Sequence, residues 1–293
     1  MRAIEPADAG YVEREGVRLH WEEFGEGEPI VVLLPTWSLV HSRHWKFQVP
    51  YLARHHRVIT FDGRGCGLSD RPRGAAAYTP VEFAADTVAV LDATGVEQAV
   101  LVAFSCGTLW ALQVAADHPA RVLGVVAISP AVSLTPMHAE RTVHPFDEPI
   151  ESTEGWAMYN RHFWDRDYEG FLNFFVGKWF NEPHSTKAME DCVGWGLEID
   201  PATLADADYG LDACGRESMR AVCERVRQPV LVIHGDEDAI RPYADGVALA
   251  EVTGGSLVTI EGGGHAPHCR DPVLVNRSLR DFIAGRCVDR TAG

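Results

Sequence analysis

The sequence predicts an α/β fold in which a mostly parallel β-sheet is covered by helices on both faces. Short apolar runs alternate with longer amphipathic segments in the first half of the chain, and the same rhythm returns from Val230. Such alternation is typical of parallel strands joined through helices. Several runs, such as Val122 to Ile128, contain no charged or hydrogen-bonding side chain. These runs indicate strands that are buried on both faces of the sheet.

The first half of the chain supplies five expected strands and three expected helices. A turn at Glu15-Gly16 precedes the first strand, and Thr79 is the expected N-cap of the second helix, where a hydroxyl can accept a hydrogen bond from the first turn. The expected strands cover residues 17–24, 30–34, 57–61, 99–104 and 122–128. The expected helices cover residues 45–53, 80–94 and 109–117.

The last quarter of the chain repeats the pattern. It supplies expected strands at residues 230–234 and 256–260, and expected helices at residues 243–251 and 273–284. Because these units resemble those of the first half, both parts are expected to build one sheet.

Between residues 133 and 216 the rhythm stops, and no β-branched strand run occurs there. We expect this segment to be an inserted helical cap, with residues 1–132 and 217–293 forming the core domain. The segment is rich in aromatic side chains at helical spacing: Trp156, Tyr159, Phe163, Trp164, Tyr168, Phe171, Phe174, Phe175, Trp179, Phe180 and Trp195. Most of them are expected simply to pack the insertion onto the core, and the remainder would give an apolar lid over a site.

Charge and composition limit the partners. Acidic residues exceed basic ones by 42 to 26, which gives a formal net charge of −16. Such a surface repels nucleic acids and anionic membranes, so neither is an expected partner. The first residues lack the apolar core of a signal peptide, and the seven cysteines form no CxxC pair. We therefore expect a cytoplasmic protein with reduced thiols, and a homodimer is an open alternative to a monomer.

A serine between small residues stands where the expected strand at residues 99–104 meets a helix. The segment reads Ala103-Phe104-Ser105-Cys106-Gly107. A nucleophile on a sharp strand-to-helix turn needs small neighbours two positions away, and the helix that follows points its amides at developing negative charge. The alternative is an ordinary junction that happens to use small residues.

Two later strand ends carry a carboxylate and an imidazole. The strand from Val230 runs into Asp236, Glu237 and Asp238, and the strand that ends at Ile260 runs through glycines into His265. A serine hydroxyl needs a base to attack a carbonyl at neutral pH, and the imidazole needs a carboxylate to fix its tautomer. The order serine, aspartate, histidine, each after a strand, is typical of one architecture.

With these elements, the chain resembles α/β-hydrolase fold proteins over nearly its whole length. Residues 61–70, FDGRGCGLSD, are similar to the D-x-R-G-x-G-x-S segment of that family. The resemblance implies a mostly parallel eight-stranded sheet with a helical cap, as in esterases, lactonases and perhydrolases. It assigns Ser105 as the nucleophile, His265 as the general base and Asp238 as the acid. Asp236 is the alternative acid, and its other expected role is a hydrogen bond within a turn.

The resemblance also implies an oxyanion hole built by the backbone amides of Trp37 and Cys106. Relatives usually carry His-Gly before the first of these residues, and this chain has Pro35-Thr36 instead. The hydroxyl of Thr36 or Ser38 is therefore a candidate additional donor.

The remaining candidate site residues are substrate contacts and metal ligands. The expected substrate-binding residues are Thr36, Phe104, Trp156, Trp164, Trp179 and His268. No metal or cofactor is expected, because His265 and His268 stand in a glycine-rich loop and no carboxylate or cysteine cluster completes a ligand set.

The leading functional prediction is a serine hydrolase that cleaves an ester or lactone bond of a bulky apolar small molecule through an acyl-enzyme. Carbon–carbon bond hydrolases and perhydrolases use similar triads and remain alternatives. A non-hydrolytic pocket enzyme, such as a cyclase or dehydratase, and a non-catalytic receptor for a small ligand also remain open, because Pro35-Thr36 departs from the usual pattern.

Overall fold

A computed structural model describes residues 4–184, 186–212 and 218–287 of the chain. The described residues form one eight-stranded sheet in the order β1-β2-β4-β3-β5-β6-β7-β8. β1 and β2 are antiparallel to their neighbours, and all the other pairs are parallel. The strands are β1 (Asp8–Arg14), β2 (Val17–Phe24), β3 (Val31–Leu33), β4 (Val58–Phe61), β5 (Ala99–Phe104), β6 (Val122–Ile128), β7 (Val230–Gly235) and β8 (Ser256–Ile260).

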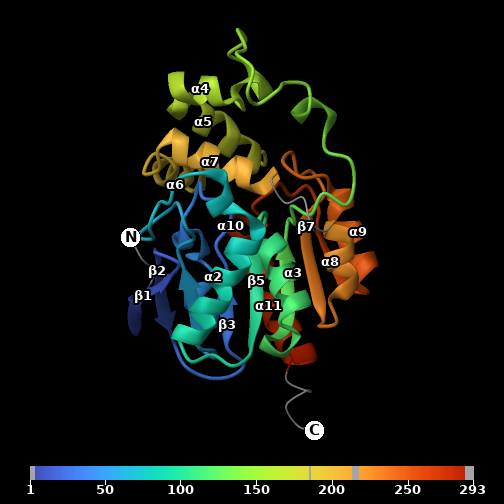
Figure 1. Ribbon diagram of the computed structural model, residues 1–293. Coiled ribbons are helices and arrows are strands. Elements are labelled where there is room, and N and C mark those ends of the chain that lie inside the picture. Colours follow the sequence, from blue (N-terminus) through green and yellow to red (C-terminus); the bar gives the residue numbers. More distant parts are fainter. Residues whose placement is uncertain (1–3, 185, 213–217, 288–293) are drawn as a thin grey trace.

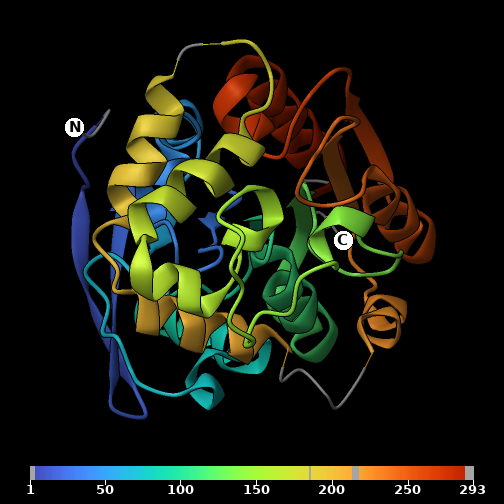
Figure 2. The same ribbon diagram turned by 90° about the horizontal axis from the view of Figure 1, so that it is seen from above.

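Helices cover both faces of the sheet (Figures 1 and 2). α2, α3, α8 and α9 lie on one face, and α1 and α11 lie on the other. Their bounds are α1 (Val49–Leu52), α2 (Pro80–Ala93), α3 (Gly107–Asp117), α8 (Met219–Arg225), α9 (Tyr243–Thr253), α10 (Pro267–Arg270) and α11 (Pro272–Phe282), with a π-helical turn at Ile283–Cys287. The central strands β3, β4, β5, β6 and β7 are buried at nearly every position, as their apolar sequences require.

Four helices between β6 and β7 form a layer above the carboxyl ends of the parallel strands (Figure 1). They are α4 (Arg161–Arg166), α5 (Tyr168–Trp179), α6 (Lys187–Gly196) and α7 (Pro201–Asp212). The expected boundary between residues 216 and 217 lies outside the described residues. α8, which follows, packs on α3 and α9 of the main body.

The expected elements differ from the structure mainly near the start of the chain. β1 was not expected, because it is an edge strand whose positions are exposed or half-buried and it therefore lacks an apolar run. The single helix expected at residues 45–53 is instead a 3₁₀ helix at Ser42–Trp45 followed by the short α1. The family-like segment at residues 61–70 forms a buried turn, and its Asp62 accepts the backbone N–H of Ser42 and of Leu68 at 2.9 Å each.

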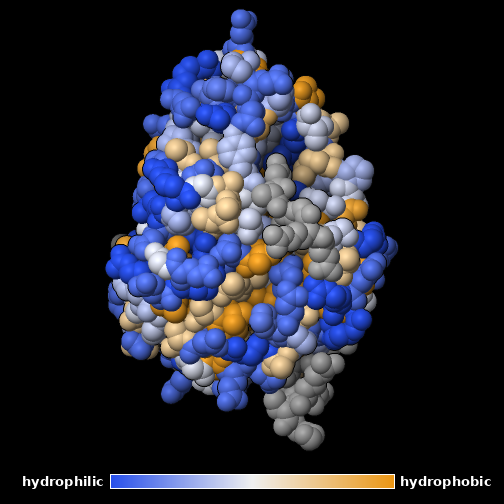
Figure 3. Space-filling model, in the orientation of Figure 1, coloured by the Kyte–Doolittle hydropathy of each residue, from blue (hydrophilic) through white to orange (hydrophobic). Residues whose placement is uncertain are grey.

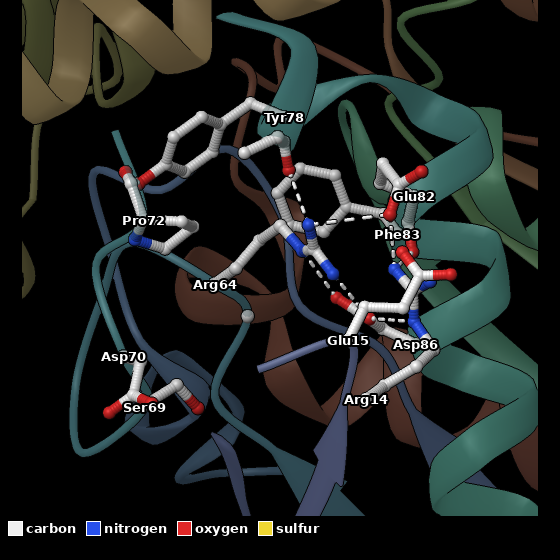
Figure 4. Close-up of polar contacts among 12 residues, drawn as sticks. Arg14, Glu15, Arg64, Ser69, Asp70, Pro72, Tyr78, Glu82, Phe83 and Asp86 are labelled. Atoms are coloured by element: carbon white, nitrogen blue, oxygen red, sulfur yellow. Dashed lines mark hydrogen bonds and ion pairs between the residues drawn. The ribbon is translucent and has the colours of Figure 1, made fainter. Parts of the chain in front are cut away.

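A buried ion network ties this turn to α2 (Figure 4). Arg64 donates two hydrogen bonds of 2.7 Å to Asp86, and Arg14 of β1 reaches the same carboxylate at 2.7 Å. Glu82 pairs with both guanidinium groups. Arg64 also donates to the carbonyl oxygen of Ala77 at 2.6 Å. Its guanidinium is thus used by the fold.

Hydrophilic side chains cover most of the visible face of the upper helical layer (Figure 3). Among the described residues, no helix is both long and apolar enough to cross a membrane.

Candidate active site

Ser105 occupies a strained turn between β5 and α3. Its φ is +52°, in the left-handed region that a residue with a side chain seldom adopts. A Cβ atom at Gly107 would lie 2.6 Å from the carbonyl oxygen of Pro35, so only glycine fits there. The other small position is Ala103, and its Cβ lies 3.6 Å from the place that a Cβ at Gly107 would occupy, which is an ordinary van der Waals contact.

The structure connects Ser105, His265 and Asp238 by a continuous chain of hydrogen bonds. The Oγ of Ser105 lies 3.0 Å from Nε2 of His265, and Nδ1 of His265 lies 2.7 Å from Oδ2 of Asp238. The side chains of His265 and Asp238 are fully buried. With Nδ1 donating to the carboxylate, Nε2 is left to accept the serine proton.

The carboxylate of Asp238 is held by four hydrogen bonds. Oδ2 also accepts from Nε2 of His234 at 2.9 Å, and Oδ1 accepts the backbone N–H groups of Ile240 and Arg241 at 2.7 and 2.9 Å. Burial by itself would raise the pKa of this carboxyl, but His265 and His234 outweigh it and hold the pKa well below its usual range. Asp238 is therefore ionised at neutral pH.

Asp236, the alternative acid, has another role. Its Oδ1 accepts the backbone N–H of Gly262 at 2.7 Å in an exposed position. The carboxylate thus connects the loop after β7 to the glycine turn after β8, in the manner of a turn-forming side chain.

His265 is enclosed by aromatic rings. The centroids of Phe104 and Trp179 lie 4.9 and 5.8 Å from its ring. Burial lowers the pKa of His265, and the opposing influence of Asp238 does not cancel this effect. The imidazole is accordingly neutral at pH 7, as a general base must be.

The two expected oxyanion donors lie beside the serine. Trp37 and Cys106 line the same cavity as Ser105, and neither backbone N–H donates to another residue in the part of the chain that the structure describes. Burial raises the pKa of the Cys106 thiol, which keeps it protonated.

Of the two candidate hydroxyl donors, one is already used. Ser38 donates to the carbonyl oxygen of Arg64 at 2.9 Å. The Thr36 hydroxyl is buried without a hydrogen-bond partner among the described residues, but Thr36 does not line the cavity.

A cavity of about 390 Å³ opens above Ser105. It is enclosed by residues of the main body and of the helical layer: Trp37, Ser105, Cys106, Ser133, Met137, Arg141, Thr142, His144, Phe146, Tyr159, Phe175, Trp179, Asp208, Leu211, Ile240, Arg241 and His265. The wall is therefore partly aromatic and partly charged.

Of the expected substrate-binding residues, only Trp179 is in this described lining; Thr36, Phe104, Trp156, Trp164 and His268 are not. Phe104 and His268 pack on one another behind His265, with centroids 4.4 Å apart. Trp164 packs on Phe171 at 4.4 Å inside the helical layer, and Trp156 lies against Arg141. These side chains support the cavity wall from behind.

His268 belongs to a second buried cluster. Its Nε2 lies 3.1 Å from Nδ1 of His44. Burial lowers the pKa of His268 to about 3, and it also holds that of His44 well below its usual value. Within the described residues, no group of three or more histidine, cysteine, aspartate or glutamate side chains is arranged to hold a metal ion.

The charged part of the cavity was not expected from the sequence. Arg141, Arg241 and Asp208 line it, and none of them belongs to a recognisable motif. The only available signal was that Arg241 follows Asp238 by three residues and so had to lie near the site.

Comparison with known proteins agrees with this geometry. The profile of the alpha/beta hydrolase fold family matches residues 29–272. The chain therefore belongs to the α/β-hydrolase fold family.

Individual relatives cover nearly the whole chain. Pimeloyl-[acyl-carrier protein] methyl ester esterase of Xanthomonas campestris is 30% identical over 91% of this chain and 99% of its own length. 2-Hydroxymuconate semialdehyde hydrolase of a Pseudomonas species is 28% identical over 92% of this chain and 91% of its own. The solved structure of Est816, described as an N-acyl homoserine lactone degrading enzyme, has a TM-score of 0.75 and 28% identity, covering 93% of this chain and all of that one. These relatives support the expectation of a hydrolase that acts on ester bonds.

Proposed function

We propose that this chain is a serine hydrolase that cleaves an ester or lactone through a Ser105 acyl-enzyme. The observation that carries the proposal is the hydrogen-bonded line from Ser105 through His265 to Asp238, with the serine held at positive φ on the floor of a cavity. Folding alone gives no reason to keep a strained serine next to a buried, neutral imidazole.

The reaction follows from these positions. Nε2 of His265 takes the proton of Ser105 as Oγ forms a bond to the acyl carbon, and the amides of Trp37 and Cys106 donate to the oxyanion. The carbon–oxygen bond to the leaving group breaks, and His265 returns the proton to the departing oxygen. A water molecule then attacks the acyl-enzyme with His265 as its base. This step releases the carboxylic acid and restores the Ser105 hydroxyl.

The backbone amides of Trp37 and Cys106, which donate to no other described residue, favour hydrolysis over the receptor and the non-hydrolytic alternatives. A binding protein has no need for donors directed at a developing oxyanion. Carbon–carbon bond hydrolysis would use the same triad and remains the second candidate. The charged side chains that line the cavity could contact a charged substrate of that class.

We also propose that residues 133–216 act as a cap. Supporting this, α4–α7 lie above the strand ends, and Tyr159, Phe175 and Asp208 of this segment line the cavity. The cap would limit the access of bulk water to the cavity and select the substrate.

Labelling with a fluorophosphonate, followed by intact-mass spectrometry and peptide mapping, tests the proposal. We expect one adduct on Ser105, none in Ser105→Ala, and a loss of ester turnover of at least about 10³-fold in that variant. Ser129→Ala is a matched control, because Ser129 is also a positive-φ serine (φ +45°) at the end of the neighbouring strand β6 but does not line the cavity. The control should be labelled like the wild type. A folded wild-type protein that resists both this probe and smaller ones would contradict the proposal.

A further inference from the structure

Two arginines share the cavity that opens above Ser105. Arg141 ends the 3₁₀ helix Ala139–Arg141 at the start of the inserted segment, and Arg241 lies in the loop between β7 and α9. They come from opposite sides of the insertion and meet at one cavity. Neither side chain is needed by the triad chemistry, because only the backbone N–H of Arg241 takes part, by donating to Asp238.

Neutral partners hold both guanidinium groups in place. Nη1 of Arg141 donates to the carbonyl oxygen of Ile240 at 2.5 Å, and Nη1 of Arg241 lies 3.3 Å from the Oγ of Ser133. The Arg141 guanidinium also lies over the rings of Trp156 and Tyr159, 4.7 and 5.5 Å from their centroids. Because Ile240 directly precedes Arg241, the first contact fixes Arg141 to the loop that carries the second arginine.

The two cavity arginines lack a paired carboxylate in the part of the chain that the structure describes. Among the described residues, neither Arg141 nor Arg241 forms an ion pair, although the chain as a whole carries a net charge of −16. The one carboxylate in the described lining, Asp208, accepts a hydrogen bond from the Tyr159 hydroxyl. Burial and the neighbouring positive charge of Arg241 lower the pKa of Arg141, and the opposing influence of Tyr159 and Asp208 does not cancel this effect. The group nevertheless stays protonated at neutral pH, as arginine does in proteins.

We propose that Arg141 and Arg241 form an anion subsite that binds a carboxylate group of the substrate, so that the natural substrate is an ester or lactone that also carries a free carboxylate. This inference rests on the proposed role of Ser105. A guanidinium presents a planar fork of N–H donors that matches a carboxylate, and such charge-assisted hydrogen bonds are strong where water is excluded. The rings of Trp37, Phe175 and Trp179 would contact the apolar part of the same molecule.

Matched chromogenic esters test the subsite. The anionic set is the mono-para-nitrophenyl esters of succinate, glutarate and adipate, which vary the distance between the ester carbonyl and the carboxylate. The neutral set replaces the free carboxylate by a carboxamide of nearly the same shape. For the best chain length we expect a kcat/KM ratio of anionic to neutral ester of about tenfold or more, expressed mainly in KM.

Substitution of the arginines should remove this preference. Arg141→Gln and Arg241→Gln should each lower the ratio severalfold, the double variant should bring it near one, and Arg141→Lys should restore part of it. Arg166→Gln is the matched control, because Arg166 is an exposed arginine of α4 that does not line the cavity. It should keep the wild-type ratio. Since each arginine is tested separately, one variant that does not fold leaves the other to decide.

A wild-type ratio near one at every chain length, or a ratio unchanged in both single variants, would overturn the subsite. Calorimetric titration of Ser105→Ala with glutarate separates this failure from that of the proposed function. If glutarate binds and the arginine substitutions abolish binding while Ser105 is unreactive, the subsite stands and the hydrolase proposal fails. If Ser105 is labelled but glutarate does not bind and the ratio is one, the hydrolase proposal stands and the subsite fails.

Discussion

Two pairs of arginines in this molecule differ in whether they form ion pairs with carboxylates. Arg14 and Arg64 share the carboxylate of Asp86 with short hydrogen bonds, and Glu82 completes the network (Figure 4). Arg141 and Arg241 line the cavity with no ion pair among the described residues.

The difference separates arginines that serve the fold from arginines that are available to a ligand. A desolvated guanidinium is costly unless a carboxylate compensates it, so the Arg64 cluster carries its own counter-ions. Among the described residues, Arg141 contacts a carbonyl oxygen and aromatic faces, which are weaker partners for a full charge than a paired carboxylate, and the charge of Asp208 acts on it without forming an ion pair. The guanidinium groups of Arg141 and Arg241 are therefore available to bind an anionic group of a ligand.

The largest effect is expected from breaking the paired cluster. Asp86→Ala would leave two guanidinium groups without their shared carboxylate, and we expect a loss of about 3–5 kcal/mol in the free energy of unfolding, measured by urea titration. Asp92→Ala, on the same helix, removes a carboxylate that pairs with Arg121 at 2.8 Å but is 62% exposed. This control should lose less than about 1 kcal/mol. Equal losses of unfolding free energy in the two variants would mean that the buried ion network of Asp86 stabilises the fold no more than the exposed pair of Asp92 and Arg121 does.

The buried pair of His44 and His268 gives a third case to compare with the two arginine pairs. It is polar and buried, but it is kept neutral instead of being paired with an opposite charge. The pKa of His268 is about 3 in the folded protein and ordinarily about 6.5, so the unfolded chain binds the extra proton first as the pH falls. The associated stability is fully present above pH 6.5 and is lost progressively below it. At pH 5 the loss from His268 alone is about 2 kcal/mol.

Unfolding of the wild type and of His268→Gln at pH 7.5 and pH 5 measures this difference. The variant should lose about 2 kcal/mol less than the wild type between the two pH values. If the wild type and the variant lose the same unfolding free energy, then His268 is protonated in the folded protein at pH 5. The histidine pair would then carry a charge, as the Arg64 cluster does.

These contrasts also show what the sequence can and cannot reveal. Val122–Ile128 and Ala99–Phe104 were predicted to the residue, because an uninterrupted apolar run has only one place in a parallel sheet. Strand ends and short motifs indicated Ser105, His265 and an acid after the strand from Val230, and the family resemblance selected Asp238 over Asp236. Their approach to within hydrogen-bonding distance is a tertiary fact that only the structure supplies.

The charged cavity wall could not be predicted in the same way. Arg141 and Arg241 are one hundred positions apart in the chain, and neither stands in a periodic or motif context. Trp164, an aromatic residue of the insertion, and Phe104, which directly precedes Ser105, were expected at the substrate. In the structure they are fully buried behind the cavity wall, where large apolar rings are most stable. The described lining is partly aromatic, but composition did not identify which aromatic side chains face the cavity.

The smallest expected effect gives the most direct test of the contrast between the two arginine pairs. Arg141→Met and Arg64→Met make the same chemical change in the two surroundings. Arg64→Met should cost about 3–5 kcal/mol of unfolding free energy, because it removes one charge from a buried ion pair. Arg141→Met gives up its contacts with the rings of Trp156 and Tyr159 but also removes a desolvated charge, so stability should stay within about 1 kcal/mol of the wild type. Urea unfolding of both variants without added anions makes the comparison. If Arg141→Met is as costly as Arg64→Met, then Arg141 serves the fold, and the anion subsite loses the premise that this arginine is reserved for a ligand.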